Sequence, residues 1–351
     1  MIPRFRWVSC QLEELRPCIT TGQLKKALQS LPKTLGETYE RILHRIPEHQ
    51  CKYVLQVLQW LAFSKCPLTL QELAAALEVD IGDGSPVKDD DKVPEPRVVL
   101  NVCSSLVTIA LDKNHVQLAH LSVQNYLTSG QIQTGKVKHF SFSAKSAHTL
   151  ISRTCLFTLL RLDNPSGWDS LAAVNSPLAL YAAKYWIQHV LSGETASSSE
   201  LERPMRGLFQ PQGAQYINWI RLYDIDRPWD PLRLRRSLST IPPPLYYASR
   251  AGLTEILGWL LDGNADVNAH GGVYGSALCA ASAAGHEAIV RLLLEKDADV
   301  NAQGGQYGNA LYVASAGGHE SCGAAPEGRR GRQRTGRTVW QRTPGGVGWG
   351  L

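Results

Sequence analysis

The stretch Ala281-Ser282-Ala283-Ala284-Gly285 decides the fold of this chain, because it is the middle one of three copies spaced 33 residues apart. The other two copies are Ala248-Ser249-Arg250-Ala251-Gly252 and Ala314-Ser315-Ala316-Gly317-Gly318. Two further motifs recur at the same offset: Asp266-Val267-Asn268-Ala269 as Asp299-Val300-Asn301-Ala302, and Tyr274-Gly275-Ser276-Ala277-Leu278 as Tyr307-Gly308-Asn309-Ala310-Leu311. A fixed period of this length predicts a solenoid of stacked units over residues 241–320.

Each unit is expected to hold two short helices and a projecting turn. In the second unit, Leu278–Ala284 predicts a helix whose alanines allow close approach, and Gly285 can end it at positive φ. Glu287–Lys296 carries an apolar stripe and predicts a second helix. The pattern resembles the ankyrin repeat, with two full copies and one partial copy. Where ankyrin repeats usually have Gly after this second helix, the chain has Asn264 and Asp297, which tolerate the left-handed conformation.

The start of the first helix departs from the ankyrin pattern. Thr-Pro-Leu-His is usual there, whereas this chain has Ser276-Ala277-Leu278-Cys279 and Asn309-Ala310-Leu311-Tyr312. We expect the change to remove a helix cap, at a cost of roughly 1 kcal/mol per repeat.

A second resemblance lies at the N-terminal end. Phe5-Arg6-Trp7-Val8-Ser9-Cys10-Gln11-Leu12 is followed by Leu31-Pro32-Lys33-Thr34-Leu35-Gly36-Glu37-Thr38-Tyr39, in which Thr34 and Glu37 have capping-box spacing. These segments resemble the region after the nucleotide-binding NACHT domain of fungal NOD-like (STAND-type) signalling ATPases, which often end in ankyrin repeats. The resemblance implies that residues 1–48 form a helical segment. It also implies that the chain is a fragment lacking the NACHT NTPase.

Residues 49–130 have the element order of a winged-helix domain. Helices are predicted at Cys51–Phe63, from Leu68 with Thr69 as N-cap, and at Arg97–Ser105. A solvated loop is expected at Asp80–Pro96, before the third helix. Strands are predicted after that helix, at Leu106–Leu111 and Val116–Leu121. His120-Leu121-Ser122-Val123-Gln124-Asn125-Tyr126-Leu127 resembles the signature that closes the winged-helix module named after GPI inositol-deacylase. His120 is interpreted as a structural residue rather than a catalytic one.

Residues 131–240 are predicted to be a helical domain and a Pro-rich linker. Helices are expected at Ala147–Leu162, Pro177–Leu191 and Tyr216–Ile220, with a Ser-rich linker at Gly193–Glu200. Tyr181, Tyr185 and Trp186 are expected to form an aromatic core stripe. Because so few repeats are not stable alone, the first repeat should dock on this domain and bury Leu245, Ile256 and Leu260. The predicted fold class is therefore mainly α, a row of helical and winged-helix domains ending in a short ankyrin solenoid.

The net charge of +5 is concentrated at the C-terminal end. Residues 321–351 contain six Arg and one Glu, which accounts for all of it, so the predicted domains are neutral. Eight Cys residues show no C-x-x-C and no zinc-ligand spacing, which favours reduced thiols in a cytoplasmic protein. The sequence has neither a signal peptide nor a run of apolar residues long enough to cross a membrane.

The tail itself is predicted to be disordered. Gly, Arg and Pro replace the Leu-rich helix that should follow Glu320. The expected next repeat, Asp-Val-Asn-Ala-Gln-Gly-Gly-Arg-Tyr-Gly-Asn-Ala-Leu-Gln-Ala-Ala, can be written in codons that, read two bases later, give Arg332–Gly346 residue for residue. We therefore interpret residues 321–351 as a frame-shifted read of a further ankyrin repeat. The alternative is a basic tail that binds nucleic acid or an acidic surface.

The motifs point away from catalysis. The chain lacks a P-loop, a dinucleotide fingerprint, HExxH, a kinase signature and the G-x-S-x-G elbow of a hydrolase. We expect no enzyme activity, no cofactor, no metal and no nucleotide, and a hydrolase resembling GPI inositol-deacylase is the disfavoured alternative. DNA binding is the other alternative, but Arg97–Ser105 carries a single basic residue and the wing offers only Lys113.

The remaining function is protein recognition by the ankyrin fingers. The partner-binding residues predicted there are His270, Val273, Tyr274, Gln303, Gln306 and Tyr307. Tyr274 and Tyr307 occupy the same position in successive repeats, so packing of one finger on the next explains them equally well. A protein partner of unknown identity is expected, with neither a membrane nor a nucleic acid as partner.

Overall fold

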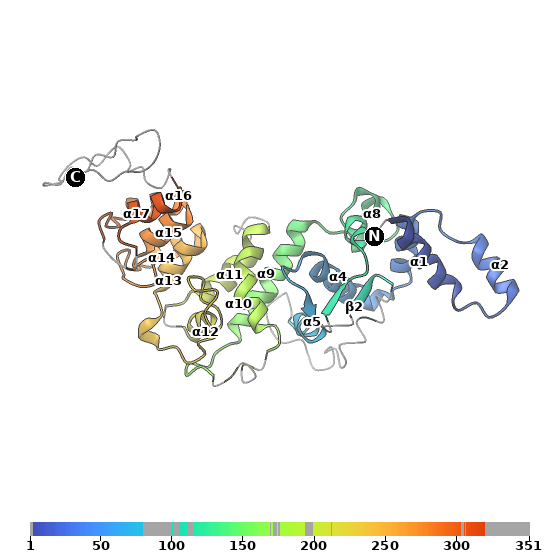
Figure 1. Ribbon diagram of the computed structural model, residues 1–351, viewed down its shortest axis with the longest axis horizontal. Helices are drawn as coiled ribbons and strands as arrows, with labels where there is room; N and C mark the ends of the chain where they lie inside the picture. Colours follow the sequence, from blue (N-terminus) through green and yellow to red (C-terminus); the bar gives the residue numbers. More distant parts are fainter. Residues whose placement is uncertain are drawn as a thin grey trace.

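The computed structural model describes residues 3–79, 100, 105–110, 115–168, 170, 174, 176–193, 199–211, 213–302, 305 and 307–319. Most of the predicted helix Arg97–Ser105, the loop Asp80–Pro96, the turn at 112–114, the residues Gln303 and Gln306, and the tail 321–351 lie outside them. The described chain is mainly α-helical, as predicted. Its domains follow one another in an elongated row, with the N-terminal helices at one end and the repeats at the other (Figure 1).

Three helices precede the winged-helix core: α1 (Pro3–Leu15), α2 (Thr21–Gln29) and α3 (Leu35–His44). Thr34 caps α3 as predicted, its Oγ1 accepting from the Glu37 N–H at 3.2 Å. The Glu37 carboxylate accepts from the Lys33 N–H at 2.8 Å, so the reciprocal bond of the predicted box falls one residue early. Tyr39 of α3 is buried and its hydroxyl lies 2.8 Å from Ser122 Oγ, which fastens α3 to the winged-helix domain.

The winged-helix domain combines helices with a small antiparallel sheet. Its described elements are α4 (Glu48–Phe63), β1 (Leu68–Thr69), α5 (Leu70–Leu77), β2 (Val107–Ala110), β3 (His115–Leu118) and α7 (Leu121–Leu127). The strand order is β1-β3-β2, with Leu68 and Ile109 both opposite Val116. Thr69 and Glu72 form the capping box at the start of α5, which confirms the predicted cap.

The predicted strand Val116–Leu121 is too long at its C-terminal end. The strand stops at Leu118, because His120 turns the chain into α7: its Nδ1 accepts from the Ser122 N–H at 3.1 Å. His120 therefore acts as the N-cap of α7, which is a structural role. β1 was not predicted, since two residues carry too little alternation to be recognised.

Residues 130–222 form the helical domain. Its elements are α8 (Gly130–Thr134), the 3₁₀ turn η2 (Lys138–Phe140), α9 (Ala144–Leu160), α10 (Ala179–Ser192), α11 (Ser199–Leu208) and α12 (Ala214–Leu222). Ser199 and Glu200 of the predicted linker Gly193–Glu200 belong to α11, a helix that was not predicted and that contains Pro204. Leu201, Met205 and Leu208 follow helical spacing there and are buried.

A buried hydrogen-bond chain joins the winged-helix domain to the helical domain. The Lys65 N–H donates to the Tyr181 hydroxyl oxygen at 3.0 Å. That oxygen lies 2.9 Å from His189 Nε2, and we assign Tyr181 O–H as the donor because a buried hydroxyl hydrogen needs an acceptor. That assignment leaves the proton of His189 on Nδ1, which donates to His148 Nδ1 at 2.9 Å. The Trp60 and Tyr181 rings pack beside this chain with centroids 5.4 Å apart. Tyr181 and Trp186 are buried, as predicted for the aromatic stripe, whereas Tyr185 is half-buried.

The repeats follow a linker that contains the 3₁₀ turn η4 (Leu238–Thr240). Their helices are α13 (Pro244–Ala251), α14 (Thr254–Asp262), α15 (Ala277–Ala284), α16 (Glu287–Glu295) and α17 (Ala310–Ala316). Gly285 ends α15 at φ 74°, while Asn264 and Asp297 adopt φ 60° and 65°. The left-handed conformation predicted at all three positions is confirmed.

The predicted loss of helix caps is wrong. Ser276 Oγ accepts from the Cys279 N–H at 3.2 Å at the start of α15. Asn309 Oδ1 accepts from the Tyr312 N–H at 3.0 Å at the start of α17. Ser and Asn therefore replace the usual Thr as caps, and the anticipated penalty does not arise.

The first repeat docks on the helical domain, as predicted. Leu245, Ile256 and Leu260 are buried. α14 contacts α11, and the Arg206 guanidinium lies over the Trp259 ring at 5.5 Å from its centroid. The described repeats thus continue the core of the preceding helices.

A buried carboxylate fixes the linker against the repeats. Asp226 accepts hydrogen bonds from the Tyr246 hydroxyl and, at 3.2 Å, from the Val273 N–H. The Tyr246 oxygen in turn accepts from the Tyr274 N–H at 3.2 Å. A Cβ on Gly272 would lie 2.0 Å from Tyr246 Cζ, so the backbone passes this ring at a distance that only Gly allows. Burial raises the pKa of Asp226, because desolvation disfavours its charge.

We predict that stability falls on acidification because of the buried His pair. Burial lowers the pKa of His189 to about 3, so the native state stays neutral while an unfolded His protonates below about 6.5. The stabilisation is complete above that pH and is lost as pH falls, by about 2 kcal/mol between pH 7.5 and 5. Urea unfolding followed by Trp fluorescence measures it. His189→Gln should flatten the dependence, whereas the exposed matched variant His139→Gln should keep it; identical slopes would contradict the assignment.

Tyr246→Phe should destabilise the repeats by about 1–3 kcal/mol. The change removes one hydroxyl but leaves the Asp226 carboxylate short of a donor and the Tyr274 N–H without an acceptor. Tyr312→Phe is the matched control, because the Tyr312 side chain is exposed. Chemical unfolding and amide exchange at Tyr274 are the measurements. Equal stability of the two variants would show that the shared hydroxyl contributes nothing.

Candidate protein-interaction surface

The first complete finger of the solenoid is a turn closed by its own backbone. The Gly271 N–H donates to the Gly275 carbonyl at 3.0 Å, which brings His270 and Tyr274 onto one turn. His270 is exposed, while Val273 and Tyr274 are half-buried. The Val273 N–H donates to the Asp226 carboxylate, and the Tyr274 N–H donates to the Tyr246 hydroxyl oxygen. The finger is therefore anchored at its base and free at its tip.

The two predicted tyrosines pack on each other. The rings of Tyr274 and Tyr307 stack with centroids 5.4 Å apart and an interplanar angle of 29°. The Arg250 guanidinium lies over Tyr274, 5.4 Å from its centroid, and its Nε is 3.4 Å from Asp226 Oδ1. Tyr274 therefore has a packing role, whereas Tyr307 keeps 45% of its surface exposed.

A side-chain amide locks one finger to the next. Asn268 Oδ1 accepts from the Asp299 N–H at 2.8 Å, and its Nδ2 donates to the Asp297 carbonyl at 3.3 Å. These bonds span successive repeats at their exposed edge. They hold the spacing of the fingers fixed before any partner arrives, which lowers the entropic cost of binding.

The structure brings four of the six predicted residues together, namely His270, Val273, Tyr274 and Tyr307. Gln303 and Gln306 lie outside the described residues. Sequence reasoning missed Arg250, Asp226 and Asn268. Arg250 carried a signal, because the corresponding positions of the next two repeats hold Ala283 and Ala316. Asp226 carried none, since it lies outside the repeats and its partners come from later in the chain.

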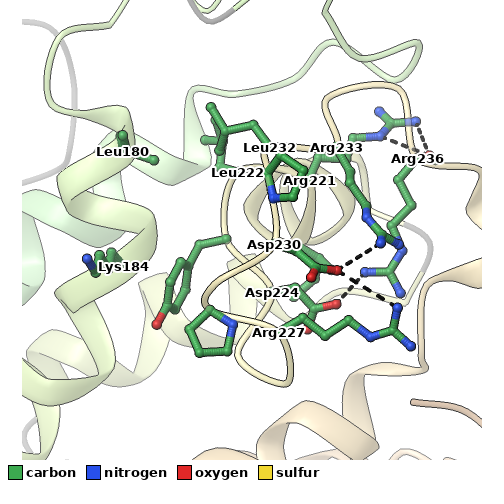
Figure 2. Close-up of a pocket in the computed structure, with 14 residues that line it drawn as sticks. Leu180, Lys184, Arg221, Leu222, Asp224, Arg227, Asp230, Leu232, Arg233 and Arg236 are labelled. Atoms are coloured by element: carbon green, nitrogen blue, oxygen red, sulfur yellow. Dashed lines mark hydrogen bonds and ion pairs between the residues drawn. The ribbon is translucent and has the colours of Figure 1, made fainter. Parts of the chain in front are cut away.

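A cavity of about 160 Å³ lies between α10, the end of α12 and the linker (Figure 2). Basic side chains crowd its rim, but acidic partners hold several of them. Asp230 lies 2.8 Å from Arg233 and 3.9 Å from Arg227, and Asp224 lies 2.7 Å from Arg236. Asp224 also accepts from the Tyr247 hydroxyl at 2.5 Å. The charges of this cavity thus serve to fold the linker onto α12 and α13.

Among the residues that the structure describes, no group of three or more His, Cys, Asp or Glu is placed to hold a metal ion. Within the same residues, no helix combines the length and apolar character needed to cross a membrane.

Comparison with known proteins gives two family matches. The model described as GPI inositol-deacylase, winged helix domain, matches residues 39–137. The model described as ankyrin repeats, three copies, matches residues 245–324. The first match includes Tyr39 of α3, which the structure packs onto α7, and the second begins at the buried Leu245.

A curated relative is the azaphilone pigments biosynthesis cluster protein L of Monascus ruber. It is 38% identical over 278 residues, which cover 74% of this chain and 58% of the relative. The chain therefore spans less than two thirds of the length of that relative. Together with the observed fold, the comparisons establish that the chain carries a winged-helix domain of the GPI inositol-deacylase type and, C-terminal to it, ankyrin repeats.

Proposed function

We propose that this chain is a non-enzymatic, regulatory interaction fragment of a NOD-like signalling protein and that it binds a protein partner through its ankyrin repeats. Ankyrin repeats suggest protein–protein interaction, because stacked repeats present an extended recognition surface. The NOD-like assignment rests on the N-terminal resemblance to the region after a NACHT domain. The winged-helix match is a likeness of one module, and we attach no deacylase activity to it.

The observation that carries the proposal is the rigid finger edge. His270 and Tyr307 are exposed, the Tyr307 ring stacks on Tyr274, and Asn268 bonds to the backbone of the next repeat. Exposed aromatic and amphipathic side chains on a preorganised backbone are what interface hot spots use. The partner is expected to contact the finger tips rather than the buried faces of the helices.

A non-enzymatic role is supported by the structural use of the His120–Ser122 pair in the winged-helix domain. His120 Nδ1 accepts from the Ser122 N–H, and Ser122 Oγ lies between that nitrogen, at 2.7 Å, and the Tyr39 hydroxyl. These groups are engaged in capping α7 and holding α3. We also propose a cytoplasmic location, which the unpaired thiols of Cys155 and Cys279 support because both are buried and free.

The test is photo-crosslinking from the finger tip of the full chain. A benzoylphenylalanine in place of His270 should capture a partner protein from the source cells, and the same substitution of the exposed His139 should not. The partner is then purified and its affinity for the full chain is measured by calorimetry. His270→Ala combined with Tyr307→Ala should weaken binding about tenfold or more, as expected for hot-spot residues.

His139→Ala is the matched control for those substitutions, and it should leave the affinity unchanged. A captured protein whose affinity is the same for the finger variant and the control would rule out the finger edge as its binding surface.

A further inference from the structure

The last described helix of the solenoid has an uncovered apolar flank. Val300, Tyr307, Leu311 and Tyr312 are 43%, 45%, 37% and 51% exposed. We call this surface, at α17 and the finger before it, the terminal face. Among the described residues, no helix follows α17. An apolar surface of this kind on a folded domain commonly marks an interaction site.

The preceding repeat shows which structure covers the equivalent residues. Leu278 and Cys279 correspond to Leu311 and Tyr312, and they are only 3% and 1% exposed. They are covered because α15 packs against α16 of its own repeat and α17 of the next. Tyr274, the counterpart of Tyr307, is covered by the Tyr307 ring. In the preceding repeat, this surface is therefore covered by the second helix of the same repeat, followed by the finger and the first helix of the next repeat.

Two polar features of the repeats recur on the terminal face. Asn268 binds the Asp297 carbonyl and the Asp299 N–H of the next repeat, and Asn301 is its counterpart one repeat later. The second feature concerns the glycines after the first helices. A Cβ at Gly252 would meet the His286 ring at 2.7 Å, and one at Gly285 would meet the His319 ring at 2.6 Å. A Cβ at Gly318 would meet nothing within 4 Å.

We propose that the terminal face binds an ankyrin repeat of another polypeptide, one that begins with a second helix. The bound unit covers Leu311 and Tyr312 with its helices and stacks an aromatic finger residue on Tyr307. Its backbone meets the Asn301 amide, and a His ring lies against Gly318. Each of these contacts copies one that the described repeats already make, so the new interface continues an interface within this chain.

A second copy of this chain is not the occupant. To continue the stack, it would have to offer the N-terminal edge of its own repeats, and that edge is in use. α14 contacts α11, and the Tyr247 ring packs against Tyr216 and Trp219 of α12 with centroids 6.4 and 6.0 Å away. The tail sequence does not offer the unit either, because residues 321–351 contain a single Leu and six Arg. The occupant that we propose is a separate ankyrin polypeptide with an open N-terminal edge.

This inference deepens the proposed function and rests on it, since it names a class of partner for the same repeats. The terminal face shares Tyr307 with the finger tips but adds Leu311 and Tyr312 of α17 and leaves out His270, so substitutions at Leu311 and at His270 test the two surfaces separately. The probe is a polypeptide of three tandem copies of residues 287–319, which starts with a second helix. In its last copy, the positions of Leu311 and Tyr312 carry Lys and Glu, which prevents head-to-tail polymerisation of the probe.

Calorimetry of the full chain with this probe should give one-to-one binding at micromolar Kd or tighter. Leu311→Glu should weaken it at least about tenfold, whereas Leu121→Glu, the same change at an exposed Leu of α7, should not. His270→Ala should leave it unchanged, which separates this result from failure of the finger-tip proposal. No binding by a probe that circular dichroism shows to be folded, or equal binding by the Leu311→Glu chain, overturns the inference.

A second measurement covers the case of a probe that does not fold. It uses a variant of the full chain in which a copy of residues 288–319 replaces residues 321–351. The copy supplies the same ankyrin unit covalently. The melting temperature of this variant should exceed that of the unaltered chain by several degrees, and Leu311→Glu should abolish the gain. A graft that leaves the melting temperature unchanged overturns the proposal.

Discussion

The placement of the repeats depends on one buried hydrogen bond, from the Tyr246 hydroxyl to the Asp226 carboxylate. Burying a carboxylate is costly unless donors surround it, and here the donors come from the first helix of the solenoid and from the Val273 N–H. The linker is therefore part of the repeat structure rather than a tether. Removal of either partner leaves the other buried and unsatisfied, so the pair fixes where the finger base lies relative to α12.

A similar device operates at the other end of the helical domain. The Lys65 N–H, Tyr181, His189 and His148 form a continuous chain in which each group donates to the next. Both junctions thus use polar groups enclosed by aromatic rings, which confer directionality that apolar packing lacks. The winged-helix domain, the helical domain and the repeats keep a defined mutual orientation. A partner bound at the fingers is consequently placed at a fixed distance from the winged helix.

Periodicity made the repeats predictable in detail, down to the left-handed Asn264 and Asp297. Local chemistry was less certain, because Ser276 and Asn309 were not recognised as replacement caps for Thr. α11 was not predicted: Pro204 disfavours a helix there, and the burial of Leu201 and Met205 offsets that cost. The candidate surface was foreseen in part. The finger position of Tyr274 and Tyr307 could be read from the repeat, but the anchoring by Asp226 depends on a contact across 47 residues that no local pattern encodes.

The regular recurrence of the inter-repeat contacts has a consequence for how such a chain can change. Asn268, Tyr274 and Gly285 each meet a partner in the next repeat, so insertion or deletion of a whole 33-residue unit preserves the pattern of these contacts. Copy number is then a trait that a single unequal recombination event can alter without a new interface having to evolve. The finger edge would lengthen or shorten by one finger at a time, while Asp226 keeps the first repeat in place.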